Sequence, residues 1–174
     1  MAIPESQLET WARQGSITQS ATTYATVRGV LDASETPYAS KDGKVFLQGS
    51  YGNDTNIYAE SDVDIVMQID GVFQHELSSL RDDQKLAFHR AMSNETYTYD
   101  ALRNDVIAVL RGSFGSSVQP GRKAIVVAAS GGRRKADVVA AMKFRRYSSF
   151  NSLSDQSYAE GICFYTTDGQ RIIN

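Results

Sequence analysis

Apolar residues recur at intervals of three and four positions in three parts of the chain. The first part covers residues 4–31, and the other two cover residues 79–93 and 97–111. This spacing places the apolar side chains on one side of a helix. The pattern therefore predicts two helices and, before them, an N-terminal helical arm in which Gly15 is a candidate break between two pieces.

Short apolar runs bounded by turn-forming residues predict β-strands in the rest of the chain. The predicted strands cover residues 44–48, 62–69, 123–129, 135–144, 161–166 and 171–173. The glycine pair after Ser130 favours a tight hairpin between the third and fourth strands, and Asp168-Gly169 favours another between the last two. The segments between 50 and 61 and between 148 and 160 are polar and are expected to be loops.

The composition is that of an ordinary globular domain. The 174 residues are 41% hydrophobic and 22% charged, which fits one domain with a substantial core. No apolar run approaches the roughly 20 residues of a membrane-spanning helix, and the N-terminus lacks the basic and apolar regions of a signal peptide. These features predict a cytoplasmic protein without membrane contact. The formal net charge of −2 and the pI near 5.7 argue against binding of long nucleic acid.

Few residues are available for redox or soft-metal chemistry. Cys163 is the only cysteine, which excludes an intrachain disulfide, a multi-cysteine zinc site and a redox pair. The two histidines, His75 and His89, lie in a polar region and are expected to have plain surface roles. Candidate chemistry therefore rests on the carboxylates.

Residues 49–67, GSYGNDTNIYAESDVDIVM, place a Gly-Ser turn a short loop ahead of two aspartates that are separated by one residue. Side chains at i and i+2 of a strand project from the same face, so Asp62 and Asp64 should point together while Val63 and Ile65 enter the core. Two carboxylates this close repel each other unless a hard cation lies between them. Mg²⁺ commonly binds through one or two carboxylates together with substrate phosphates, so the pair predicts a divalent metal and a triphosphate.

A third carboxylate would complete such a site, and Asp137 is the best candidate because it lies within an apolar run. A buried, unpaired carboxylate is destabilising, so an aspartate between Ala136 and Val138 needs a partner or a metal. If its strand neighbours the strand of Asp62 and Asp64, three carboxylates converge. Such a group could hold two cations around the in-line displacement of a phosphoryl group.

Each candidate residue has an expected role in this chemistry. Gly49 would let the backbone approach the β- and γ-phosphates, and Ser50 would offer its N–H and hydroxyl groups to them. Asp62 and Asp64 would ligate the metal that carries the triphosphate and would also contact the second ion. Asp137 would complete the second metal site and could take the proton of an attacking 3′-hydroxyl.

Most of these elements also have a plainer interpretation. A Gly-Ser pair or a D-x-D motif alone is common by chance. Arg133, Arg134 and Lys135 could hold a triphosphate tail, but a solvated turn is favoured. Tyr51 and Tyr58 could stack on a base, although loop aromatics more often pack locally. The order of strand, Gly-Ser turn, loop, D-x-D strand and late aspartate makes the prediction specific.

Several segments resemble the bacterial cGAS/DncV-like nucleotidyltransferases (CD-NTases), relatives of oligoadenylate synthase within the DNA polymerase β-like superfamily. These segments are Gly49-Ser50, Thr55-Asn56-Ile57, Ser61-Asp62-Val63-Asp64, Asp137 and the C-terminal GICFYTTDGQRIIN, which is similar to the last hairpin of that family's catalytic core. The resemblance covers nearly the whole chain. It implies an α+β, polymerase β-like fold in which a mixed, mostly antiparallel sheet is flanked by helices.

The resemblance also implies an activity. CD-NTases use ATP or other NTPs with two Mg²⁺ ions, for which Mn²⁺ is an alternative, and make a cyclic or linear oligonucleotide second messenger. The signal commonly activates an effector in anti-phage defence, sometimes under the control of accessory regulatory proteins.

One departure from the family concerns length. Family members usually continue past the position of Asn174 into a helical C-terminal domain that closes the nucleotide cleft, and this chain ends there. Residues 1–174 are thus expected to be a nucleotidyltransferase core: a fragment of a longer enzyme, a core completed by a second chain, or a reduced form with little cyclase activity.

Two other functions stay open. One is transfer of a nucleotide to a protein or RNA acceptor, as in small toxin–antitoxin nucleotidyltransferases, which the long helical arm fits poorly. The other is a nucleotide-binding or assembly module without turnover. The complete set of Asp62, Asp64 and Asp137 argues against this second function.

Overall fold

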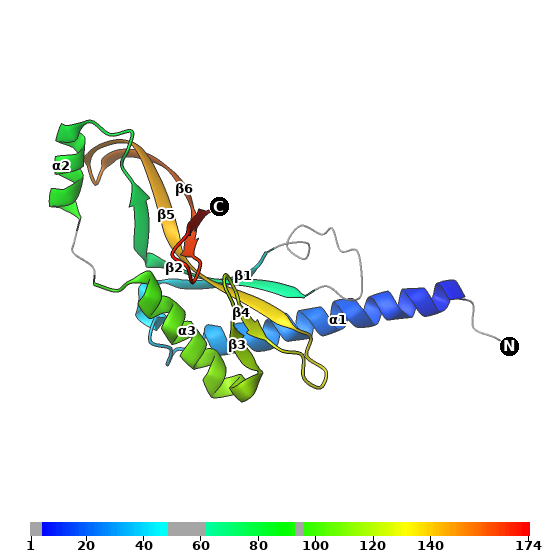
Figure 1. Ribbon diagram of the computed structural model, residues 1–174. Coiled ribbons are helices and arrows are strands. Elements are labelled where there is room, and N and C mark those ends of the chain that lie inside the picture. The colour runs from blue at the N-terminus through cyan, green and yellow to red at the C-terminus, as the bar shows by residue number, and fades with distance from the viewer. Residues whose placement is uncertain (1–4, 49–61, 93–95) are drawn as a thin grey trace.

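The computed structural model of the chain describes residues 5–48, 62–92 and 96–174, with side chains described from residue 18 onward (Figure 1). The elements in chain order are α1 (Glu5–Leu31), η1 (Ala39–Lys41), β1 (Gly43–Leu47), β2 (Val63–Glu76), α2 (Asp82–Ala91), α3 (Tyr99–Phe114), η3 (Gly115–Ser117), β3 (Val118–Pro120), β4 (Ile125–Val127), β5 (Ala136–Ser152), β6 (Asp155–Tyr165) and β7 (Arg171–Ile173). The predicted α+β class is confirmed.

The strands form one seven-stranded sheet whose main order is β1-β2-β5-β4-β3. The long strand β5 pairs with β4 near its start and with β6 further along, and β7 continues the sheet from β6. Among the strands of the described residues, β2 and β5 form a parallel pair and the other pairs are antiparallel. The prediction of a mixed, mostly antiparallel sheet is therefore confirmed.

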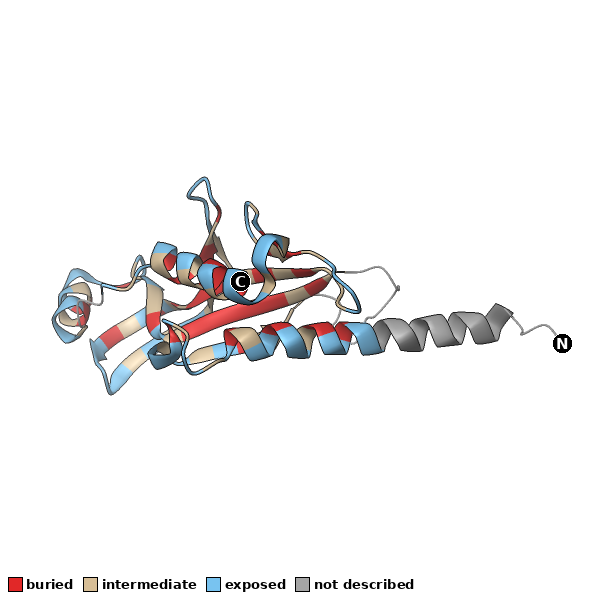
Figure 2. Ribbon diagram, turned by 90° about the horizontal axis from the view of Figure 1, so that it is seen from below, coloured by how far each residue is buried: buried red, intermediate tan, exposed pale blue. Residues whose placement is uncertain are grey.

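Helices α1 and α3 cover the same face of this sheet, which we call the helical face (Figure 2). Alternation turns every second residue of β2 toward them, so Val63, Ile65 and Met67 are fully buried. On α3, apolar residues four positions apart point back at the sheet, and Thr98 begins that helix by accepting a hydrogen bond from Ala101 N at 3.2 Å. The main core lies between the helices and this face.

A second, smaller core forms at the far end of β5 and β6, where α2 lies (Figure 1). Phe88 of α2 packs edge-on against Tyr147 and Phe150 of β5, with ring centroids 5.1 and 5.2 Å apart. The predicted polar loop between residues 148 and 160 is wrong here, because β5 runs to Ser152 and β6 begins at Asp155. The strands of a β-hairpin are joined by backbone hydrogen bonds, and a few packed side chains are enough to hold the hairpin in place. Its other side chains can therefore be polar.

Three other elements differ from the sequence prediction. Helix α1 is continuous through Gly15, since one glycine weakens a helix by only about 1 kcal/mol and need not end it. Strand β2 extends seven residues beyond the predicted Ile69, through an irregularity at Gly71 where a Cβ atom would lie 2.9 Å from the Lys41 carbonyl oxygen. The short strand β3 was not predicted.

The structure can be compared with three expectations that were drawn from the composition. No helix within the described part of the chain is long and apolar enough to cross a membrane. Cys163 is buried with a free thiol, and His75 and His89 are both exposed. The cytoplasmic location stays a prediction.

Candidate functional site

Asp62 and Asp64 lie where the chain enters the central strand β2. Val63 and Ile65 are buried under the helices, as predicted, so Asp64 projects from the opposite face of the sheet. We call this face the carboxylate face. The entry of β2 is tied to the end of β1, because Gln48 N donates a hydrogen bond to Asp64 O at 2.9 Å.

Asp137 lies directly beside Asp64. The parallel pairing of β2 with β5 places Val63 opposite Ala136 and Asp64 opposite Asp137. Paired residues in neighbouring strands share a face at a strand separation of about 4.8 Å, so both aspartates project from the carboxylate face. The condition on which convergence of the carboxylates depended, that these two strands are neighbours, is met. Gly49 and Ser50, the predicted phosphate-binding turn, lie outside the described residues, as do Tyr51 and Tyr58.

The ammonium group of Lys135 lies between two of the acids. Its Nζ atom is 2.5 Å from Asp62 Oδ2 and 3.4 Å from Asp137 Oδ1. The hydrogen bond to Asp62 is the main cause of a raised pKa at Lys135, with the Asp137 charge adding to it. Lys135 therefore belongs to the site, whereas the sequence favoured a solvated turn. The signal was its spacing, because a residue two before Asp137 in an extended chain faces the same way.

The arginines of the same hairpin turn are also not simply solvated. The guanidinium of Arg133 lies over the Phe114 ring, 4.4 Å from its centroid, and donates to Ala128 O at 2.8 Å. The backbone N–H of Arg134 donates to the buried Thr23 Oγ1 at 2.8 Å. These contacts hold the hairpin against α3 and α1 and so fix the backbone that carries Lys135.

Negative charge exceeds positive charge at this site. Burial raises the pKa of Asp64, and the charges of Asp137 and Asp62 raise it further, while Lys135 lowers it. In addition, Asp137 Oδ1 is buried and has no hydrogen-bond partner among the residues that the structure describes. One ammonium thus faces three carboxylates, and a buried oxygen is left with a single long ionic contact. Such an arrangement is destabilising unless another cation binds.

The donor set at this site fits a hard divalent cation. Mg²⁺ prefers carboxylate oxygens together with water and phosphate oxygens, and the site offers six carboxylate oxygens on one sheet face. Within the described residues, no three acidic, histidine or cysteine side chains already form a complete metal-ligand group. A metal ion that contacts Asp62 and Asp137 would meet the Lys135 ammonium, whose Nζ lies 2.5 and 3.4 Å from their carboxylate oxygens.

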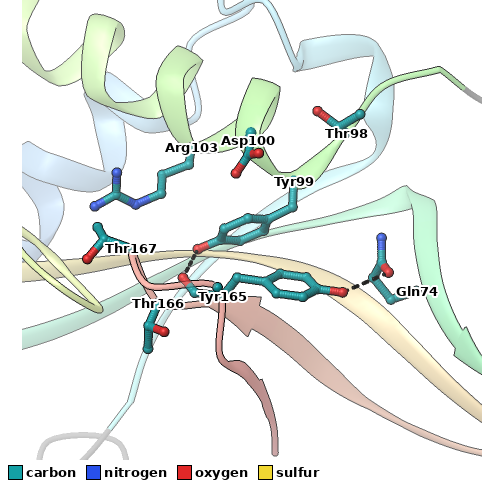
Figure 3. Close-up of a pocket in the computed structure, with 9 residues that line it drawn as sticks. Gln74, Thr98, Tyr99, Asp100, Arg103, Tyr165, Thr166 and Thr167 are labelled. Carbon is teal, nitrogen blue, oxygen red and sulfur yellow. Dashed lines mark hydrogen bonds between the residues drawn. The ribbon is translucent and has the colours of Figure 1, made fainter.

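A pocket on the helical face is a separate feature (Figure 3). This pocket of about 520 Å³ lies between the start of α3 and the end of β6. Tyr165 donates to Gln74 Oε1 at 3.2 Å, and Gln74 donates to Met142 Sδ at 3.7 Å. Met142 is five residues from Asp137 along β5, so the two side chains lie on opposite faces. A nucleotide bound by the carboxylates would not occupy this pocket.

Comparison with known proteins shows which proteins this chain is similar to in sequence. No protein-family profile matches the chain. The chain is 38% identical over 178 residues to a cyclic nucleotide synthase CdnE01 from Staphylococcus haemolyticus, covering all of this chain and 59% of that protein. It is 38% identical to the cyclic UMP-AMP synthase of Rhodothermus marinus, of which it covers 56%.

Solved structures agree with these sequence matches. The structure of the Rhodothermus marinus CdnE c-UMP-AMP synthase with Apcpp and Upnpp matches 99% of this chain with a TM-score of 0.77 and 35% identity. The Elizabethkingia meningoseptica CdnE cyclic dinucleotide synthase with GTP and Apcpp matches with a TM-score of 0.57 and 31% identity. The chain is a CD-NTase homologue. It spans 56% and 55% of the length of these two CD-NTase chains, so the resemblance seen in the sequence is confirmed for that part.

Proposed function

We propose that the chain is the catalytic core of a Mg²⁺-dependent nucleotidyltransferase that joins NTPs into a cyclic or linear oligonucleotide second messenger. The observation that carries the proposal is the pairing of Asp64 with Asp137 on one sheet face, with Asp62 beside them. The names of the relatives support it, since they are cyclic nucleotide synthases, and two solved relatives hold nucleoside triphosphates or their analogues.

The role proposed for each residue follows from its position. Asp62 and Asp64, at the entry of β2, would hold the metal that accompanies the triphosphate, and Asp137 would complete a second metal site. Two ions bound there would stabilise the charge on both the attacking and the leaving oxygen. Asp137, whose Oδ1 has no hydrogen-bond partner within the described ranges, could also accept the proton of the attacking 3′-hydroxyl. Gly49 and Ser50 would hold the β- and γ-phosphates through backbone N–H groups.

The wider biology is proposed from the same relationship. Anti-phage signalling, a downstream effector and accessory regulatory proteins are the setting we propose. A helical lobe, in the same polypeptide or from another chain, would close the nucleotide over the carboxylate face. Only a small nucleotide, and no long nucleic acid, is expected to bind.

Incubation with labelled NTPs and Mg²⁺ or Mn²⁺ tests the proposal. The wild-type protein should form phosphatase-resistant oligonucleotides, and the Asp62→Asn/Asp64→Asn pair should lower the rate at least about a hundredfold. This loss is expected because several kcal/mol of charge stabilisation are removed and each 1.36 kcal/mol is a tenfold change in rate. Asp32→Asn, which changes a half-exposed carboxylate that pairs with Arg28 at 3.6 Å, is the control and should keep wild-type activity.

Three outcomes would contradict the proposal. Products that persist unchanged in the double variant would separate the activity from these carboxylates. A labelled protein or RNA acceptor without a small product would favour the toxin–antitoxin type of transfer. Binding of ATP with no turnover, even after a helical lobe is supplied, would favour a nucleotide-binding module.

A further inference from the structure

We propose that Lys135 is a place-holding cation, whose ammonium occupies the position at which a divalent metal would contact Asp62 and Asp137 and which that metal must displace. The inference rests on the proposed function, because it assumes that these aspartates bind metal. It assigns to Lys135 a role that is neither catalytic nor phosphate-binding.

The distances make simultaneous binding unfavourable. Lys135 Nζ lies 2.5 Å from Asp62 Oδ2 and 3.4 Å from Asp137 Oδ1, so it bridges a carboxylate directly before β2 and one on β5. Mg²⁺ requires its oxygen ligands at about 2.0–2.1 Å in near-octahedral geometry. An ammonium group and a metal ion that share the same carboxylate oxygens would repel each other at close range.

The structure lets the side chain move while the backbone stays in place. Val63 N donates to Lys135 O at 3.0 Å, which joins the backbone of Lys135 to the start of β2. The preceding residue, Arg134, is bonded through its N–H to Thr23 of α1. The Lys135 side chain itself is 41% exposed, so solvent is available to an ammonium that leaves the acids. Its displacement requires only side-chain rotation.

The charge balance favours exchange for a divalent ion. Lys135 supplies one positive charge to three carboxylates, and Asp137 Oδ1 accepts no hydrogen bond from any part of the chain that the structure describes. A divalent cation would neutralise more of this charge and could use that oxygen. Lys143, on the same sheet face, provides the contrast: it is only 18% exposed and contacts Asp70 at 3.2 Å and Glu160 at 3.3 Å. Its charges are already balanced, so no exchange is expected there.

The test is a titration of the metal-free protein with Mn²⁺. Electron paramagnetic resonance measures the concentration of unbound Mn²⁺ at each step. Lys135→Met leaves an unbranched side chain that is one atom shorter and removes the competing charge. It should bind Mn²⁺ about two- to fivefold more tightly than wild type, the size expected for loss of one part-exposed ion pair. The melting temperature of the variant in EDTA should fall, and Mn²⁺ should raise it by more than in wild type.

Lys85→Met is the matched control. Lys85 is 39% exposed and pairs with Asp82 at 3.2 Å on α2, remote from the carboxylates. Its variant should bind Mn²⁺ as wild type does, which separates a local effect of Lys135 from a general effect of losing a lysine.

The outcomes separate this inference from the proposed function. If wild type binds Mn²⁺ in a manner that Asp62→Asn/Asp64→Asn abolishes, but Lys135→Met has unchanged affinity, the place-holding role alone is overturned. Unchanged Mn²⁺ affinity with weaker ATP binding would instead assign Lys135 to the triphosphate. If wild type binds no Mn²⁺, with or without ATP, the metal-dependent function fails and the inference fails with it.

Discussion

Two acidic clusters occupy the same face of the sheet, and they differ in how their charge is balanced. At one, Asp70 is contacted by Lys44, Lys143 and Gln68, its side chain is 5% exposed, and these partners hold its pKa below the ordinary value despite burial. At the other, six residues earlier on β2, Asp64 lies beside two further carboxylates and its pKa is raised. The same residue type in the same strand thus has opposite electrostatic environments.

The difference separates a structural carboxylate from a binding carboxylate. Around Asp70, basic and acidic side chains alternate. Lys143 also contacts Glu160, and Glu160 in turn contacts Arg145 at 3.1 Å. This network is complete without a ligand, so it holds β1, β2, β5 and β6 together. The Asp62, Asp64 and Asp137 cluster is incomplete, which lowers stability until a cation binds. Surplus charge of this kind is typical of functional sites.

The largest expected difference between the two acidic clusters is in the effect of a substitution on catalysis. Asp137→Asn should lower the rate of nucleotide joining about a hundredfold or more, because it removes a charge that only the metal-bound state uses fully. The free energy of unfolding should stay the same or rise. Product formation and urea unfolding, measured on the same preparation, check both parts. Asp155→Asn, at the exposed start of β6, should change neither, and an active Asp137→Asn enzyme would remove Asp137 from the site.

A smaller effect, on stability, is expected at the balanced cluster. Asp70→Asn should lower the free energy of unfolding at pH 7 by about 2–3 kcal/mol, because it leaves the largely buried Lys143 without its main partner. Mn²⁺ affinity should not change. If Asp70→Asn weakened metal binding while stability was preserved, the two clusters would not have the separate roles assigned to them.

The pH dependence of that stability loss follows from the sign of the pKa shift. The native pKa of Asp70 is below its ordinary value of 3.8, so its contribution is fully present above 3.8 and is lost as the pH falls through the lower native value. The difference between wild type and Asp70→Asn should therefore shrink in the acid range. Urea unfolding of both proteins at pH 7 and at several values below 3.8 measures it.

The smallest effect has the opposite sign. In the metal-free protein Asp64→Asn should raise the free energy of unfolding at pH 7 by about 1 kcal/mol, a change in melting temperature of about 2–4 °C. The reason is that a raised native pKa means the charged form destabilises the folded state, and asparagine removes the charge. Scanning calorimetry in EDTA checks this, and excess Mn²⁺ should remove the advantage. A variant less stable than wild type in EDTA would show that the charge at Asp64 is already compensated.

Local patterns predicted the parts of the fold that depend on nearest neighbours. The burial of Val63 and Ile65 followed from alternation, and the hairpin at Gly131-Gly132 followed from turn chemistry, with Gly131 at a φ of +58°. The long β5–β6 hairpin was missed because its polar residues carry no strand pattern. Its stability depends on the aromatic cluster with α2, whose residues are distant in sequence.

The sequence alone determined that Asp62 and Asp64 share a face, that Asp137 lies in an apolar strand, and that the chain resembles the CD-NTases. These conclusions need only the two-residue period of a strand and a recognisable order of motifs. Tertiary structure decided that β2 and β5 are parallel neighbours and so place Asp64 beside Asp137, and that Lys135 lies between Asp62 and Asp137. It also decided that Asp70 is neutralised by lysines from two other strands. Charge balance depends on distances between strands, which a linear pattern does not contain.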